Sequence, residues 1–468
     1  MLEFRSADNL ALAVQLLYVL VATLRAPKVA LSVRLNCCFL YVCFIFPTNL
    51  IAQTVSLDSE QTEDVPRSWL YKVKLLSFGS ESFGPIYFLL LGMLGINFVL
   101  IAFSKRHVVR LVAWHIPVLF FFSLGMISAA YNPLGIEFKN LGYAVREFFA
   151  ISFGLSAGTL IVMSGKSVET LDMMVTDLCL IIVIGCVPYG LADSSVLWTR
   201  EFDRVWLLPS QSAVLPGYFA MSLWFFKGKR KIKKLIAIFV ALLSLYSASK
   251  DSFFIYLMIL AIAALRISAD HLRKYQNVTV LMIIAWVAIG NIVPIFVSHY
   301  WLVEPLPSLE TRYFQTVNAL AAIWDGGTTQ LLFGLGWNQW YPLSQSFPFV
   351  DWMSGPLEEV TSTDARYMLS VPFVATLRSI GLVGLIGMIG FIFYVGKGLM
   401  KHASKFGPLM AVVCFTVLVN FCFTAVTGQV ESMMFISMIV AILGMKEVIE
   451  VNPLAGQKVL MEIAQTPT

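Results

Sequence analysis

The chain has 468 residues, of which 58% are hydrophobic and 13% are charged, and its mean hydropathy is +0.78. This composition excludes an ordinary soluble domain, in which about a quarter of the residues are charged. The formal net charge of +5 does not indicate a nucleic-acid partner, because the basic residues are spread over short turns between apolar segments. The sequence therefore predicts an integral membrane protein that binds no nucleic acid.

Apolar segments recur along the chain, and most are long enough to cross a bilayer, which takes about 20 residues of helix. They predict an all-α transmembrane bundle of about 12–13 helices, with residues 1–468 as a single membrane domain. The first segment follows acidic as well as basic residues, so we expect a membrane helix there and not a signal peptide. The expected helices lie near 8–24, 35–55, 83–103, 109–130, 143–163, 173–191, 212–226, 232–248, 252–267, 277–297, 371–396, 407–427 and 429–446.

The connections between these helices alternate in charge. Basic turns lie near residues 25–34, 105–110, 227–234, 273–274 and 397–405, and acidic loops lie at 56–82, 192–211 and 298–370. Because basic turns are retained on the cytoplasmic side of a membrane, the three acidic loops are expected outside. The same alternation predicts an outer N-terminus and an inner C-terminus.

The sequence shows no pattern typical of a bound cofactor or metal. All seven cysteines lie in apolar segments, which indicates neither a disulfide framework nor a zinc site. No nucleotide-binding loop and no Ser/His/Asp arrangement stands out. The energy for any synthesis or transport is therefore expected from a gradient or from an activated lipid substrate.

The acidic loop 298–370 is the most informative part of the chain, because long loops are usually functional or disordered. It holds seven acidic residues and two cations, Arg312 and Arg366. The charge rule for loops does not explain arginines on the outer side, so they need another role. The apolar stretch 319–324 after Arg312 predicts a helix that lies across the top of the bundle.

The middle of this loop contains glycines and aromatic residues. Gly334-x-Gly336 predicts a close approach of the backbone to a ligand, because glycine has no side chain to prevent it. The following Trp337, Trp340 and Tyr341 have two interpretations. They either stack on sugar rings or form a belt at the membrane surface.

A second basic site precedes the helix expected at 212–226. Arg200 and Arg204 lie just before its start, where a planar guanidinium and a helix N-terminus together suit a phosphate group. The alternative is a solvated loop, in which both arginines pair with Glu201 and Asp203. These two acids also give a weaker indication of a metal site.

Two further charged pairs lie within or beside apolar segments. Lys250 and Asp251 lie between two short apolar helices, where the lysine either binds a diphosphate or faces water in a turn. Arg146 and Glu147 lie inside the segment 143–163. They either form an internal ion pair that fixes helix packing or line a cavity for a lipid headgroup.

Four segments, in their order along residues 200–445, resemble the O-antigen polymerase and O-antigen ligase superfamily of bacterial membrane glycosyltransferases. The first runs from Arg204 to Ser210, and the second is Ser249-Lys250-Asp251. The third is the loop that begins near Arg312 and continues to Gly334-x-Gly336. The fourth is the helix with Gly381-Leu-Val-Gly384, which lacks the acidic residue of the family pattern.

This resemblance implies a polymerase of lipid-linked oligosaccharide repeats in the bacterial inner membrane, with the large loop in the periplasm. The donor would be a glycan on undecaprenyl diphosphate, extended into O-antigen, capsule or exopolysaccharide, with a flippase and a chain-length regulator as partners. Arg312, Arg204 and Lys250 are the expected catalytic cations. The expected ligands of the donor diphosphate are Arg200, Arg146 and Arg366.

One departure from the family concerns the catalytic base. Ligase-like members carry a histidine eleven residues before the helix glycine, but that position is Ser370 here. The difference favours a polymerase over a ligase that transfers glycan to a lipid core. A transporter or flippase of lipid-linked glycan is the alternative from another class. The remaining candidates for a base are His299, Glu310, Glu358, Glu359 and Asp364.

Overall fold

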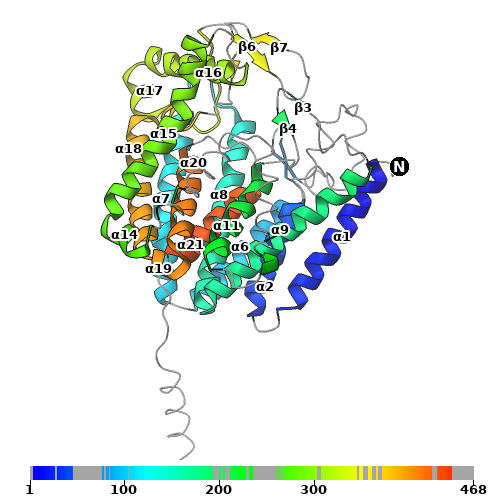
Figure 1. Cartoon of the computed structure of the whole chain (residues 1–468). Helices are drawn as coiled ribbons and strands as arrows, with labels where there is room; N and C mark the ends of the chain where they lie inside the picture. The colour runs from blue at the N-terminus through cyan, green and yellow to red at the C-terminus, as the bar shows by residue number, and fades with distance from the viewer. Residues whose placement is uncertain are drawn as a thin grey trace, which may run out of the picture.

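The computed structural model describes residues 4–26, 29–45, 76–78, 81–83, 85–103, 105–192, 200–201, 204–205, 211–227, 231–233, 235, 261–262, 265, 267–302, 307–344, 347–350, 357–360, 365–366, 371–423 and 430–444. Over these ranges the protein is an all-α bundle (Figure 1). The long helices are α1 (Phe4–Leu24), α2 (Leu31–Ile45), α6 (Pro85–Ala102), α7 (Lys105–Ala129), α8 (Phe138–Met163), α9 (Ser167–Ala192), α11 (Gln211–Lys227), α15 (Gln276–Trp301), α18 (Val374–Lys401), α20 (Pro408–Phe423) and α21 (Val430–Gly444).

These helices confirm the expected all-α class and fall on eleven of the expected segments. The other two segments, 232–248 and 252–267, lie largely outside the described residues. Within the described ranges, five helices are long and apolar enough to cross a membrane: Pro85–Ala102, His107–Ala129, Ala144–Met163, Gln276–Trp301 and Val374–Lys401. The protein is therefore expected to associate with a membrane.

Shorter elements lie between the long helices. The other helices are α14 (Ala269–Lys274), α16 (Pro307–Asp325), α17 (Gly327–Phe333) and α19 (Ala403–Phe406), of which only α16 is longer than seven residues. Four antiparallel strand pairs are present: β1 (Leu76–Phe78) with β2 (Glu81–Phe83), β3 (Arg200–Glu201) with β4 (Arg204–Val205), β5 (Tyr341–Pro342) with β8 (Ala365–Arg366), and β6 (Phe347–Val350) with β7 (Leu357–Val360). The acidic loop 298–370 thus contains regular structure.

The two ends of the bundle differ. Figure 1 places α14 and α19, which carry Arg273, Lys274 and Lys405, at the lower end. The same view places α16 and the β6–β7 hairpin at the upper end. Two of the expected basic turns are therefore at the end opposite the large acidic loop. Their orientation relative to the cytoplasm stays a prediction.

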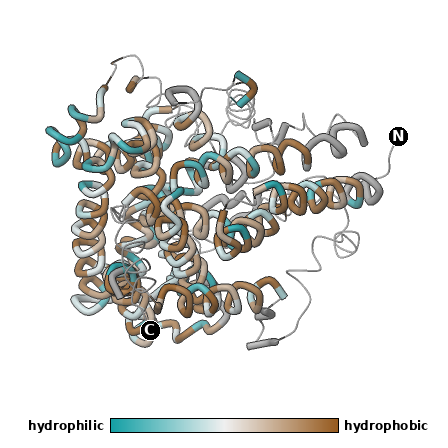
Figure 2. The backbone as a smooth tube through the Cα atoms, turned by 90° about the horizontal axis from the view of Figure 1, so that it is seen from below, coloured by the Kyte–Doolittle hydropathy of each residue, from teal (hydrophilic) through white to brown (hydrophobic). Residues whose placement is uncertain are grey.

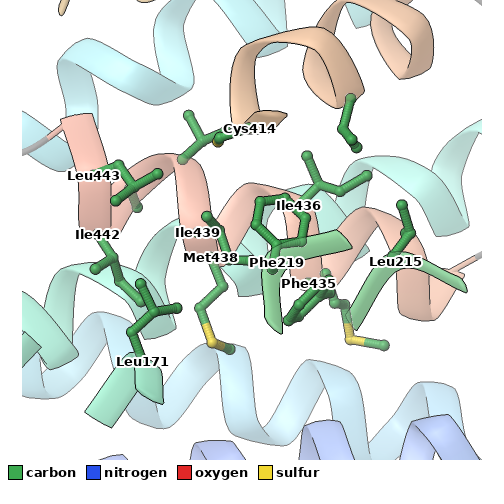
Figure 3. Close-up of a cluster of buried hydrophobic side chains, with 14 of the residues drawn as sticks. Leu171, Leu215, Phe219, Cys414, Phe435, Ile436, Met438, Ile439, Ile442 and Leu443 are labelled. Carbon is green, nitrogen blue, oxygen red and sulfur yellow. The ribbon is translucent and has the colours of Figure 1, made fainter. Parts of the chain in front are cut away.

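Close packing of α8 on α21 forms the centre of the bundle. Gly158 lies against α21 so tightly that an added Cβ would come within 2.6 Å of Met438 O and of Ala441 Cβ. Such small residues let helix backbones approach one another inside a membrane, where burial of apolar side chains gives little driving force. Figure 3 shows the neighbouring core, in which Phe219 of α11 meets Phe435 of α21. Their ring centroids are 5.4 Å apart at 86°.

The outer surface of the bundle is also apolar. Exposed side chains of α15 form a continuous stripe, and Figure 2 shows hydrophobic residues along outer as well as inner helices. A helix that is apolar on all sides suits burial in lipid. The stripe consists of Val278, Leu281, Met282, Trp286, Ile289 and Val293.

A buried carboxylate joins α9 to the first two helices. Asp177 has no exposed surface and forms an ion pair with Arg25. Its two oxygens accept hydrogen bonds from the hydroxyls of Tyr18, at 2.8 Å, and Tyr41, at 3.1 Å. Charged groups within a bundle are costly unless they are paired in this way. The carboxylate therefore fixes α1 and α2 against α9.

Replacing Asp177 by alanine is expected to lower the free energy of unfolding by about 2 kcal/mol, because two hydroxyls and a guanidinium lose their acceptor. The measurement is the thermal stability of the purified protein in detergent. Asp172→Ala is the matched control, since this carboxylate of the same helix is partly exposed and pairs with Lys233. Equal losses in the two variants would contradict the structural role of Asp177.

Candidate functional site

Helix α16 is the element on which the candidate site depends. The predicted helix after Arg312 is confirmed, and it runs from Pro307 to Asp325 at the upper end of the bundle (Figure 1). Proline at the first helical position needs no hydrogen-bond acceptor for its nitrogen, and Glu310 in the first turn favours the positive end of the helix dipole. The helix stops where Gly327 adopts a φ of +75°.

The start of α16 packs against the end of α15 through a polar and aromatic cluster. His299 Nδ1 lies 2.8 Å from Glu310 Oε1, and the two side chains keep 24% and 15% of their surface exposed. The imidazole stacks on the ring of Tyr313, with centroids 3.6 Å apart at 13°. The hydroxyls of Tyr300 and Tyr313 are 2.7 Å apart. We call these four residues the His299 cluster.

Tyr313 of this cluster is held in its neutral form. The hydrogen bond with Tyr300 raises the pKa of Tyr313 to about 12, and burial and the nearby Glu310 carboxylate add to this rise. Tyr313 therefore stays protonated at neutral pH and presents an uncharged ring to the imidazole.

The second oxygen of Glu310 is also informative. Oε2 is buried and has no hydrogen-bond partner within the described part of the chain. A carboxylate accepts hydrogen bonds only, so its contact with Nδ1 leaves Nε2 of His299 as the nitrogen with a lone pair. The pair is thus arranged as a proton acceptor supported by a carboxylate.

Arg312 lies on the same helix as Glu310, half-buried and two residues further on. Two residues correspond to roughly 200° around an α-helix, so the two side chains leave α16 on different sides. All side chains of a helix lean towards its N-terminus, however. Both groups therefore lean towards the same end of α16.

A buried arginine that sequence reasoning missed lies at the start of α18. Arg378 is 0% exposed, and its guanidinium contacts Gln339 O at 3.4 Å and Ser379 Oγ at 3.1 Å. It also lies over the ring of Tyr341, 5.7 Å from the centroid. A single cation inside the apolar segment 371–396 was the signal that could have identified it. Its enclosure indicates that it supports the loop above it.

The glycines of the loop approach protein backbone and not a ligand. An added Cβ at Gly334 would lie 2.6 Å from Arg378 O, and one at Gly336 would lie 2.5 Å from Ala129 Cα. The expected close approach is therefore present, but the contacts are with α18 and α7. The loop can approach α18 this closely because the helix is broken at Gly381, where φ is +64°. The N–H of Leu335 donates to Arg378 O at 2.6 Å, beside this break.

The aromatic residues after the glycines also face the protein. Trp337 Nε1 donates to Phe121 O at 3.2 Å, and Tyr341 is fully buried. Tyr341 is therefore part of neither a sugar platform nor a surface belt, whereas the half-buried Trp337 is hydrogen-bonded to α7. Three strongly exposed aromatics near α16 suit that belt instead: Tyr300, Trp301 and Trp324. Aromatic rings with polar edges collect at the membrane surface, so these three side chains suit a position of α16 at that level.

The other predicted arginines lie on α8, β3, β4 and β8. Arg146 is half-buried on α8, with its guanidinium 4.8 Å from the ring centroid of Tyr87. The neighbouring Glu147 lines a largely apolar cavity of about 160 Å³, which lies among α7, α8, α18, α20 and α21. Arg204 of β4 lies opposite Glu201 of β3, a register that suits the solvated-loop alternative. Arg366 of β8 lies opposite Tyr341 of β5.

The other candidate site residues lie on β7 or outside the described residues. Glu358 and Glu359 occupy β7, opposite Phe349 and Pro348 of β6. Lys250, Asp203, Asp364 and Ser370 lie outside the described residues. Among the residues that the structure describes, no group of three or more His, Cys, Asp or Glu side chains is placed to hold a metal ion.

Comparison of the chain with protein-family models, with curated proteins and with solved structures gave no match.

Replacing Gly336 by alanine is expected to destabilise the protein by about 3 kcal/mol or more, because the new Cβ would meet the backbone of α7. Gly327→Ala is the matched control, since this glycine also has a positive φ but lies in open space. The control should lose only about 1–2 kcal/mol. The yield of folded protein in the membrane and its thermal stability measure both effects. A Gly336 variant no weaker than the control would contradict the observed packing.

Proposed function

We propose that the protein polymerises lipid-linked oligosaccharide repeats at the outer face of the bacterial inner membrane, with its large loop in the periplasm. The donor is a glycan on undecaprenyl diphosphate, and the product is an O-antigen, capsule or exopolysaccharide chain. The supporting observation is α16, an outer-end helix that carries a half-buried arginine beside exposed interfacial aromatics. This is the level at which a lipid diphosphate lies.

The proposed reaction requires little covalent chemistry from the protein. A hydroxyl at the end of the acceptor glycan attacks the anomeric carbon of the donor glycan, and undecaprenyl diphosphate leaves with the bonding electrons. The donor is already activated, so no nucleotide, cofactor or metal is needed at this step. Positioning of the two glycans and stabilisation of the departing charge supply the rate enhancement.

Arg312 is the cation that the geometry supports best for the diphosphate. It leans towards the N-terminus of α16, where free backbone N–H groups also attract anions. A guanidinium offers two parallel donors to phosphate oxygens, which a lysine does not. Arg204 and Lys250 stay in the proposal as further catalytic cations, and Arg200, Arg146 and Arg366 as further ligands of the diphosphate. Arg378 is not a ligand in this scheme, because it is enclosed by protein.

The cellular test is deletion of the gene. The deletion strain is expected to carry surface glycan with a single repeat unit, because repeats are still made and flipped but not joined. Electrophoresis of the surface glycan measures the chain length. A strain with normal long chains would contradict the proposal, and full-length glycan retained on undecaprenyl diphosphate would favour a ligase.

Arg312→Ala is expected to reduce chain extension by about 100-fold, the usual cost of losing one group that stabilises departing charge. Arg312→Lys should retain part of the activity, since it keeps the charge but loses the two-pronged contact. Arg273→Ala, an exposed arginine at the opposite end of the bundle, is the control and should be active. Full activity of Arg312→Ala, at equal protein in the membrane, would remove Arg312 from the mechanism.

A further inference from the structure

We infer that His299, held by Glu310, is the general base that accepts the proton of the attacking sugar hydroxyl. This inference rests on the proposed glycosyl transfer and assigns the group that the sequence left open. It is carried by a 2.8 Å contact between two side chains that are eleven residues apart and belong to different helices. The contact brings together two of the five candidates for the base.

The geometry fixes which nitrogen can react. Because Glu310 Oε1 can only accept, the short contact places the proton on Nδ1 and leaves the lone pair on Nε2. Stacking on Tyr313 fixes the plane of the imidazole, and the ring of Phe314 meets it edge-on, with centroids 5.7 Å apart. The base is therefore oriented before the acceptor glycan arrives.

The surroundings favour the charge that forms on the ring. Glu310 is mostly buried, so its negative charge acts on the imidazolium at short range with little screening. His299 also lies in the last turn of α15, where the negative end of the helix dipole stabilises cations. The titratable groups that face the imidazole are Glu310, Tyr313 and Tyr300, and the raised pKa of Tyr313 keeps that residue uncharged.

The other candidates fit the role less well. One oxygen of Glu310 is committed to His299 and the other is buried, so this carboxylate positions the base and does not itself meet the substrate. Glu358 and Glu359 lie on β7, whereas β6 is the strand of this hairpin that packs on α16. Among the other described histidines, His115 is buried and bonds Leu111 O, and His271 lies on α14 at the opposite end.

In the proposed step one bond forms at the anomeric carbon and one breaks. The acceptor hydroxyl oxygen forms a bond to the anomeric carbon of the donor glycan, and its proton moves to Nε2 of His299. The bond between the anomeric carbon and the diphosphate oxygen breaks, and undecaprenyl diphosphate takes the electron pair. The imidazolium then returns its proton to solvent, and the chain is longer by one repeat.

The test uses the purified full-length protein in lipid nanodiscs. Its substrate is the lipid-linked repeat extracted from membranes of the deletion strain, and chain growth is followed from about pH 5 to pH 9. His299→Gln is expected to lose about 100- to 10 000-fold in kcat/KM, together with the acidic limb of the rate profile. Glu310→Gln should lose about 10-fold and move that limb to lower pH, because the imidazolium loses its negative partner.

A separate readout distinguishes a base from a merely structural residue. Binding of undecaprenyl diphosphate alone should change less than twofold in His299→Gln, because the base does not contact the diphosphate. His271→Gln is the matched control, an exposed histidine that bonds Ser268 and should keep the full rate. Retention of rate and pH profile by His299→Gln would overturn the inference, as would parallel loss of rate and of diphosphate binding. If the wild type joins no repeats, the proposed function itself fails, and the base with it.

Discussion

Every backbone polar group within a bilayer needs a hydrogen-bond partner inside the protein. The break in α18 at Gly381 leaves carbonyls of this helix without their usual partners within the helix. The carbonyls of Arg378 and Ser379 accept hydrogen bonds from the N–H groups of Leu335 and Gly336 beside the break, at 2.6 and 3.0 Å. The loop therefore completes a membrane helix. It needs glycine at 334 and 336, because side chains there would collide with α18 and α7.

This backbone contact fixes the rest of the outer end. Asn132 donates to the carbonyls of Leu335 and Trp340 at 3.1 and 2.9 Å, and Ser128 donates to Phe333 O. The end of α7 is thereby joined to the loop that follows α16 and α17. At its other end α16 is joined to α15 through His299 and Glu310. The helix that carries the candidate site is thus held between two anchored points.

The two arginines at this end illustrate how burial separates support from chemistry. Arg378 is enclosed among Gln339, Ser379 and Tyr341, so a substrate has no access to it. Arg312 is half-buried at the start of an amphipathic helix, where part of its surface is available. A cation that retains access at the membrane surface suits a lipid diphosphate, whereas the enclosed one suits a structural role.

The sequence predicted the long apolar helices because runs of about 20 apolar residues favour a continuous helix. It also predicted α16, from the apolar spacing after Arg312. It could not predict that Gly334 and Gly336 face protein, because that depends on the break in α18 more than 40 residues later in the chain. For the same reason the hydrogen bond from the half-buried Trp337 to α7 was not predicted.

The site itself was predicted only in part. His299 and Glu310 were both candidates, but their contact depends on how α16 folds back on α15, which residue spacing does not determine. Arg378 was hidden in a segment defined by its hydropathy. The glycosyl transfer stays a proposal that rests on the sequence pattern of residues 200–445, whereas the arrangement at α16 is described by the structure.

The central claim is that chain growth and release of the lipid diphosphate are one event at the outer end of the bundle. The most direct measurement reconstitutes the full chain in liposomes with lipid-linked repeats and no nucleotide, and counts both products. The account predicts one undecaprenyl diphosphate released for each repeat added. Movement of lipid-linked glycan across the membrane with no new glycosidic bond and no released diphosphate would contradict it.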